Sequence, residues 1–251
     1  IDQLSAMLIE GSNTITRSFT DAAGNTGLAL IQVEYRLGEI YEAEWDYSRK
    51  VFILTNSFAT IIEPVAEFPL LLRLNECNFP FHEAQPDGAD FRVASSDNIH
   101  LPYQIEHWDA ELKEALVWVL TDTIFPANDT QYVRIYWGNT RAIDSSNSSA
   151  VFASTNGFSG VWHLSDINDA TSHENHGINN GAVVRKGIIG DAHWFDGSDD
   201  ILTIPHRSIY NFTSSMSIST WVKADKSQTS AWTRIVDKYI HPAQGFCLIL
   251  T

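Results

Sequence analysis

The stretch Tyr132-Val133-Arg134-Ile135-Tyr136-Trp137-Gly138-Asn139 gives the clearest indication of the fold. In an extended chain the side chains of Val133, Ile135 and Trp137 point one way, and those of the residues between them point the other way. This period of two residues indicates a β-strand with one buried face. The pair Gly138-Asn139 then supplies a turn, as expected where a strand ends.

Similar stretches precede this one, separated by turn groups rich in Gly, Pro, Asn, Asp and Ser. The predicted strands are Lys50–Thr55, Leu70–Leu74, Phe91–Ala94, Tyr103–Trp108 and Ala115–Thr121. Short strands at this rhythm predict an antiparallel β-sandwich. Aromatic residues make up 12% of the 251 residues, and runs of helix-favouring residues are scarce. The composition therefore also predicts an all-β fold.

The charge of the chain excludes some classes of partner. It carries 16 Lys+Arg and 31 Asp+Glu, a formal net charge of −15. We expect no nucleic-acid binding, because the phosphate backbone would repel this charge. No apolar run approaches the roughly 20 residues that span a bilayer, so we expect no membrane insertion by this segment. The acidic excess suits the binding of divalent cations.

Residues 1–36 read as two strands and a turn, which cannot bury a core by themselves. We therefore expect them to be the tail of a larger domain. The phrases Glu10-Gly11-Ser12-Asn13-Thr14-Ile15 and Thr20-Asp21-Ala22-Ala23-Gly24-Asn25 resemble the last hairpin of bacterial immunoglobulin-like repeats. The resemblance implies a spacer in a long surface protein, with no chemistry of its own.

Five phrases between residues 44 and 152 occur together in a recognisable order. They are Trp45-Asp46-Tyr47-Ser48-Arg49-Lys50, Phe68-Pro69-Leu70-Leu71-Leu72, Pro86-Asp87-Gly88-Ala89-Asp90-Phe91-Arg92, Leu101-Pro102-Tyr103-Gln104-Ile105-Glu106-His107-Trp108 and Val133-Arg134-Ile135-Tyr136-Trp137-Gly138-Asn139. This stretch resembles the bacterial domain of unknown function 2341 family. The resemblance implies an exported multidomain protein, and some members are fused to a proton-channel subunit of the flagellar-motor and Tol type.

Residues 158–251 resemble the first part of a laminin-G-like, concanavalin-A-like jelly roll. The matching phrases are Gly160-Val161-Trp162-His163-Leu164, Asn175-His176-Gly177, Gly190-Asp191-Ala192-His193-Trp194-Phe195-Asp196-Gly197-Ser198-Asp199-Asp200 and Ser217-Ile218-Ser219-Thr220-Trp221-Val222-Lys223. Strands are predicted at Gly160–Leu164, Met216–Lys223 and Phe246–Leu250, with a strand-to-turn unit at Asp191–Asp200. Such jelly rolls are usually longer, so we expect the polypeptide to continue beyond both ends.

The turn Asp196-Gly197-Ser198-Asp199-Asp200 places three carboxylates within five residues. Carboxylate and backbone oxygens are the ligands that calcium prefers, and the glycine permits a sharp bend. The turn predicts a calcium site at Asp196, Asp199 and Asp200, and the jelly-roll resemblance adds Asp169. The alternative is a solvated turn in which Asp196 caps backbone amides.

Other side chains with catalytic or metal-binding chemistry do not form a standard motif. His163, His173, His176 and His193 lack the spacing of a zinc site, so we expect them to satisfy backbone groups by hydrogen bonding. Carboxylates flank His107-Trp108, but no pair stands out as a hydrolytic pair. Cys77 and Cys247 lie in different predicted domains, and we expect no bridge between them. We predict that this segment is not an enzyme.

Most of the eight tryptophans lie in predicted strands and are expected in the core. Trp108, beside a turn, and Trp232, after a polar loop, are the predicted surface residues that would stack on a sugar.

Together these patterns predict a non-catalytic segment of a large exported bacterial surface protein that acts in adhesion or glycan recognition. Its partners would be a glycan or a surface protein, besides the remainder of its own polypeptide. We expect it outside the cell or on the cell surface, with the periplasm as the alternative. Two other functions stay open: an accessory region of a polysaccharide-degrading enzyme, and the extracytoplasmic sensor region of a proton-channel protein.

Overall fold

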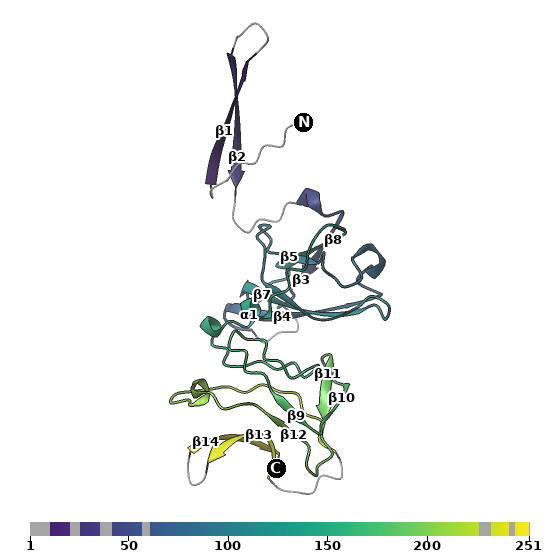
Figure 1. The fold of residues 1–251 in the computed structure, drawn as a ribbon, viewed down its shortest axis with the longest axis vertical. Coiled ribbons are helices and arrows are strands. Elements are labelled where there is room, and N and C mark those ends of the chain that lie inside the picture. Colours follow the sequence, from purple (N-terminus) through teal and green to yellow (C-terminus); the bar gives the residue numbers. More distant parts are fainter. Residues whose placement is uncertain are drawn as a thin grey trace. The chain divides into compact units, whose positions relative to one another are not determined.

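The computed structural model describes residues 11–20, 26–35, 42–56, 61–225, 232–240 and 244–250 (Figure 1). These residues form mainly antiparallel β-sheets, so the all-β prediction is confirmed. The described part contains one short α-helix, α1 (Ser148–Val151). It also contains the 3-10 turns Glu42–Glu44, Phe81–Glu83, Ser154–Asn156 and Ser208–Tyr210. No helix of this part is both long and apolar enough to cross a membrane.

The chain divides into two compact units that interleave along the sequence. Unit 1 comprises residues 1–68, 80–102 and 121–145, and unit 2 comprises residues 69–79, 103–120 and 146–251. Strands β4 (Val65–Asn75) and β7 (Glu114–Ile124) each contribute residues to both units.

Unit 1 begins with the hairpin of β1 (Gly11–Thr20) and β2 (Thr26–Tyr35), which pair antiparallel along their whole length (Figure 1). The two strands predicted for residues 1–36 are therefore present. Residues 1–10 and the predicted turn at residues 21–25 lie outside the described part.

The main sheet of unit 1 has the order β3-β8-β5, formed by β3 (Tyr47–Phe52), β8 (Tyr132–Trp137) and β5 (Arg92–Ala94). Val133, Ile135 and Trp137 are buried, as the alternation predicted. Tyr136 is also buried, because it packs with Ala94 against the partly buried Trp45.

A hydrogen-bonded cluster of buried polar groups, centred on Asp90 and Arg92, holds the adjoining loops against this sheet. The Asp90 side chain accepts hydrogen bonds from the amides of Gln85 (2.9 Å), Gly138 (2.7 Å) and Asn139 (3.1 Å). The buried Arg92 donates to backbone carbonyls, including that of Ala89 at 2.9 Å. Gly138 has φ +91°, and a Cβ there would lie 2.7 Å from the Tyr47 ring. The turn after β8 therefore needs glycine.

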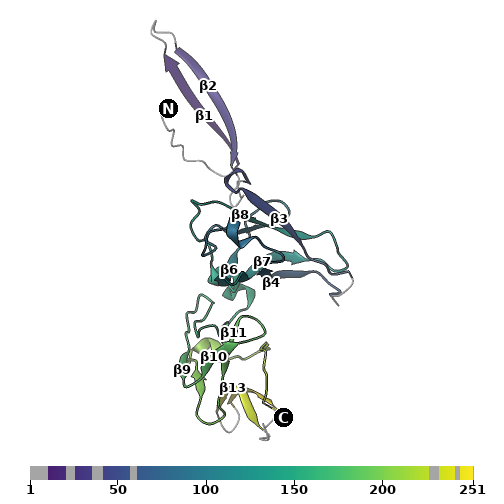
Figure 2. The same ribbon diagram turned by 90° about the vertical axis from the view of Figure 1, so that its right-hand side faces the viewer.

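A second three-stranded sheet has the order β4-β7-β6, with β6 at Tyr103–Asp109 (Figure 2). Strands β6 and β7 form an antiparallel hairpin with a bulge between Ile105 and His107. Within unit 2, the Asn147 side chain caps α1 by accepting from the Ala150 amide. This cap sets the helix so that Phe152 packs against Trp118.

Residues 178–250 form three two-stranded antiparallel sheets (Figures 1 and 2). They pair β9 (Ile178–Asn180) with β12 (Ile201–Thr203), β10 (Val183–Lys186) with β11 (Asp191–Trp194), and β13 (Thr233–Ile240) with β14 (Gln244–Leu250). The predicted strand at Phe246–Leu250 lies in β14, and the strand-to-turn unit at Asp191–Asp200 begins with β11.

Two predicted strands, Gly160–Leu164 and Met216–Lys223, are wrong, because neither stretch forms a strand. In the first, the Val161 amide donates to the Asp169 side chain rather than to a neighbouring strand, and Leu164 has a φ of +67°, outside the β region. In the second, alternating residues define a face, but the described residues provide no partner strand for the ladder.

Candidate functional site

The three carboxylates of the predicted calcium turn do come together. Ligand oxygens of Asp196, Asp199 and Asp200 lie within 4.8 Å of one another. Oxygens bound to one calcium ion at about 2.3–2.6 Å would have similar separations, so the turn fits the ion. The turn is also ordered by its own bonds, because the Asp200 side chain accepts from the Asp196 amide at 2.8 Å.

Asp169 is not part of this group. Its buried carboxylate accepts hydrogen bonds from the amides of Val161 (3.1 Å), Thr171 (3.0 Å) and Asn175 (3.1 Å), and from the Thr171 hydroxyl (2.9 Å). The Asn175 side chain then donates to the Pro205 carbonyl at 2.8 Å. Asp169 therefore fastens the polar loop of unit 2 to the segment after β12.

The two predicted sugar-stacking tryptophans have different surroundings. Trp108 is partly buried and meets the Phe79 ring edge to face, with centroids 5.5 Å apart. Trp232 is 74% exposed, and its backbone has a φ of +97°. Of the two, only Trp232 presents its ring freely to solvent.

Within unit 2, an acid and an imidazole that the sequence did not link lie side by side. The Glu106 side chain is 2% exposed and the His163 side chain 11% exposed, and 3.4 Å separates Glu106 Oε2 from His163 Nδ1. Trp118 Nε1 donates to the same oxygen at 2.5 Å, and its ring stacks on the imidazole. The second imidazole nitrogen lies 3.1 Å from Gln104 Oε1.

Burial moves both pKa values toward the neutral forms. It raises the pKa of Glu106, against opposing contributions from the Trp118 hydrogen bond and the charge of Arg73. It lowers the pKa of His163 to about 4, although Asp166 acts in the opposite direction. When His163 Nε2 donates to Gln104, Nδ1 faces Glu106 with a lone pair. A proton on Glu106 then converts this contact from repulsive to attractive.

His176 and His193 have the predicted structural role of hydrogen bonding to backbone groups. His176 Nδ1 accepts from the Asp169 amide at 3.1 Å, and His193 Nδ1 lies 3.1 Å from the Leu164 carbonyl. Cys77 and Cys247 are free, as expected.

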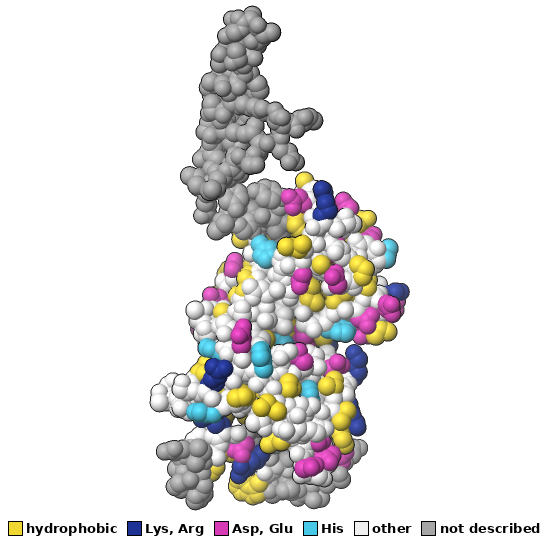
Figure 3. All heavy atoms as spheres, viewed as in Figure 1, with side chains coloured by type: hydrophobic (Ala, Val, Ile, Leu, Met, Phe, Trp, Pro, Cys, Tyr) yellow, Lys and Arg dark blue, Asp and Glu magenta, His cyan; other side chains and the backbone are white. Residues whose placement is uncertain are grey.

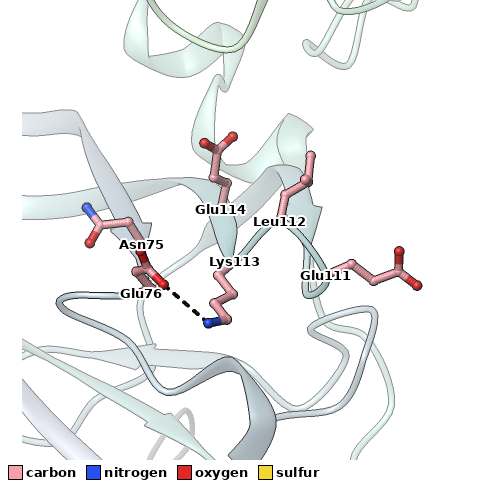
Figure 4. A pocket seen from close by; sticks show the side chains of 6 residues that line it. All are labelled: Asn75, Glu76, Glu111, Leu112, Lys113 and Glu114. Carbon is pink, nitrogen blue, oxygen red and sulfur yellow. Dashed lines mark hydrogen bonds and ion pairs between the residues drawn. The ribbon is translucent and has the colours of Figure 1, made fainter.

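An open hollow lies beside the β6–β7 turn (Figure 4). Its lining residues are Asn75, Glu76, Glu111, Leu112, Lys113 and Glu114. Lys113 pairs with Glu76 at 3.2 Å, whereas the side chains of Glu111 and Glu114 point in different directions. These glutamates are not among the described carboxylate groups that converge closely enough for a metal.

Residues 87–166 match the family model described as Domain of unknown function (DUF2341). The predicted resemblance to this family is confirmed over that stretch. No curated protein and no solved structure matches the chain. The match does not cover residues 44–86, where the first two of the five phrases lie. It also does not cover residues 1–36 or 167–251, for which the resemblances to immunoglobulin-like repeats and to a jelly roll stay predictions.

The DUF2341 match includes the Glu106–His163 pair and, of the residues described around Asp90, all except Gln85 and Tyr47. It ends beyond residue 152, so it contains His163, which the phrase Gly160–Leu164 had assigned to the jelly roll. The predicted strands Tyr103–Trp108 and Ala115–Thr121 contain Glu106 and Trp118. The pairing with His163 depends on α1 and the following turn, for which the sequence gave no signal.

Proposed function

We propose that this chain is a non-catalytic binding region of an exported bacterial surface protein, and that its ligand is a glycan. The observation that carries the proposal is the presentation of Trp232. Large exposed apolar groups mark binding surfaces, and an aromatic ring offers a flat face to the apolar face of a sugar.

The backbone supports a role for Trp232 in binding. A positive φ at a bulky residue costs about 1–3 kcal/mol and is found mainly where function requires it. The Trp232 amide donates to the Leu250 carbonyl at 3.4 Å, which ties this residue to the β13–β14 hairpin. The ring is thus held in place on its backbone side and open to solvent on the other.

The surroundings of the buried acids favour binding over catalysis. The carboxylates of Asp90 and Asp169 are occupied by backbone amides, and the Glu106–His163 pair is shielded from solvent. A general acid or base must reach the proton it transfers, which these groups do not do. The DUF2341 resemblance favours export, and we place the protein outside the cell or at its surface.

A glycan array tests the proposal with the wild-type chain, Trp232→Ala and Trp221→Ala. Trp221 is the matched control, because its side chain is 71% exposed and its replacement by alanine removes the same kind of ring. We expect glycan hits that weaken about tenfold in Trp232→Ala, since truncating a tryptophan that anchors a ligand costs more than about 1 kcal/mol, and that persist in Trp221→Ala. Unchanged binding by Trp232→Ala would contradict the role of this residue. An empty array would contradict glycan recognition and favour a protein partner.

A further inference from the structure

Beyond the pair Ser48–Tyr136, the outer face of the β3–β8 pair in unit 1 carries two further neighbouring cross-strand pairs. Lys50 lies directly opposite Arg134, and Phe52 lies directly opposite Tyr132. We call these four residues the outer strip. The inner face of the same strands carries the buried Val133 and Ile135, so the strip faces away from the core.

Like charges directly opposite each other destabilise an antiparallel pair. Lys50 and Arg134 form no ion pair with a carboxylate of the described residues, although the chain has almost twice as many acids as bases. The compensation they receive is aromatic. Lys50 Nζ lies 4.2 Å and Arg134 Cζ 5.9 Å from the centre of the Tyr132 ring. Two cations are thus held around one ring, and no carboxylate in the described part of the chain pairs with either of them.

The aromatic half of the strip is open to a ligand. Phe52 is 54% exposed, and its ring meets the edge of Tyr132 with centroids 5.8 Å apart. Lys50 is exposed, and Arg134 is partly exposed. A ligand of about one sugar ring can therefore contact the exposed ring and both charges.

We propose that the outer strip binds a uronic acid residue of a glycan. A uronic acid carries its carboxylate directly on the sugar ring, so the ring stacks on Phe52 while the carboxylate lies between Lys50 and Arg134. The arginine fork matches a planar carboxylate, and the ligand supplies the negative charge that the protein does not. This inference rests on the proposed glycan binding and names a ligand class and a site separate from Trp232.

The test measures binding of tri-galacturonate by isothermal titration calorimetry, with a neutral galactose trisaccharide and triglutamate as comparison ligands. The decisive variant is Lys50→Glu, which turns the like-charge pair into a complementary pair with Arg134. We expect tri-galacturonate binding to weaken about tenfold or more, in line with loss of a charge contact and gain of a repulsive one. The melting temperature should stay the same or rise, because the cross-strand repulsion is removed.

Lys113→Glu is the matched control, since Lys113 is also exposed and the change in net charge is the same. Binding should change less than twofold in this variant. Wild-type binding should also weaken between 50 and 300 mM NaCl, because screening reduces exposed charge contacts. If Lys50→Glu does not fold, Lys50→Gln takes its place, and weaker tri-galacturonate binding than that of the wild type is again the expected result.

Unchanged tri-galacturonate binding by Lys50→Glu, or no binding by the wild type, would overturn the proposal. Equal affinity for triglutamate would also overturn it, because the site would then select charge without the sugar. These failures differ from failure of the proposed function. Neutral glycan binding that depends on Trp232 would survive them. Conversely, uronate binding that depends on Lys50, together with array hits that are unchanged in Trp232→Ala, would support the outer strip and contradict the role of Trp232.

Discussion

Asp90, Arg92 and Trp137 are buried in unit 1, whereas Asp199, Trp221 and Trp232 are exposed in residues 178–250. The same residue types thus have opposite environments in two regions of one chain. In the first region Asp90 and Arg92 bond to backbone amides and carbonyls and hold loops onto the β3-β8-β5 sheet, and Trp137 Nε1 donates to the Glu83 side chain at 3.1 Å. In the second region they face solvent. The comparison teaches that environment, more than residue type, separates structural residues from candidates for binding.

Burial along the chain follows the same division. Among the residues whose burial the structure describes, the buried hydrophobic side chains lie between Ile53 and Ala182, and none from 183 to 250 is buried. Figure 3 shows hydrophobic side chains on the surface of the viewed face over β9–β12. Two-stranded sheets are marginally stable by themselves. The free energy of folding therefore comes mainly from the residues before 183.

Replacing the buried carboxylate is the strongest test of this division. We expect Asp90→Ala to cost about 3 kcal/mol of unfolding free energy, because three amide donors lose a charged acceptor. In calcium-free buffer, Asp199→Ala removes an exposed carboxylate and should change stability by less than about 0.5 kcal/mol. Urea denaturation of both variants measures the difference. Similar costs at the two sites would show that the division by burial does not govern stability.

The pH dependence of stability sharpens the comparison at the Glu106–His163 pair. Burial lowers the pKa of His163 to about 4 in the folded protein, below its ordinary value of 6.5. Between these values the unfolded state binds more protons, so this contribution to stability is lost as pH falls from 6.5 to 4. The expected loss is roughly 1–3 kcal/mol.

Two variants isolate this effect from the titration of other carboxylates. His163→Gln should flatten the stability profile between pH 6.5 and 4 relative to wild type. Glu106→Gln should steepen it, because the raised pKa of Glu106 adds stability as pH falls and so opposes the loss from His163. Urea midpoints measured across this range provide the comparison. Parallel profiles for wild type and His163→Gln would rule out a buried neutral imidazole.

The sequence predicted the fold best where one strand buries one face. Alternation located β8, because apolar residues at every second position define a core face without knowledge of the partner strand. Runs of strand-forming residues between turn groups located β6 and β7. Alternation failed at Met216–Lys223, where the same pattern occurs without a ladder. Alternation is a property of one segment, whereas hydrogen bonding in a sheet also requires a second segment to serve as the partner strand.

Candidate site residues were predictable to the extent that they were close in sequence. Asp196, Asp199 and Asp200 meet because one turn carries them all. Glu106 and His163 meet only through packing around α1, and Lys50 and Arg134 only through the register of β3 on β8. Those contacts join residues more than fifty positions apart, and no local spacing rule describes them.

The smallest expected effect concerns the carboxylate turn, which tests whether the exposed region also has a structural ligand. The oxygens of Asp196, Asp199 and Asp200 are close enough to share a calcium ion. Exposed sites of this kind bind with dissociation constants of about 0.1–1 mM, so millimolar calcium would add roughly 0.5–1.5 kcal/mol. Chelation should therefore lower the melting temperature by a few degrees.

Asp199→Ala decides whether the turn causes that change. The variant should melt at the same temperature with and without calcium, because two carboxylates retain too few ligands for the ion. Asp166→Ala is the control, since Asp166 is an exposed acid of another loop that bonds to Asn168. A calcium effect that persists in Asp199→Ala would place the ion elsewhere. If chelation does not change the melting temperature of the wild type, the turn is a solvated one, held by the hydrogen bond from the Asp196 amide to the Asp200 side chain.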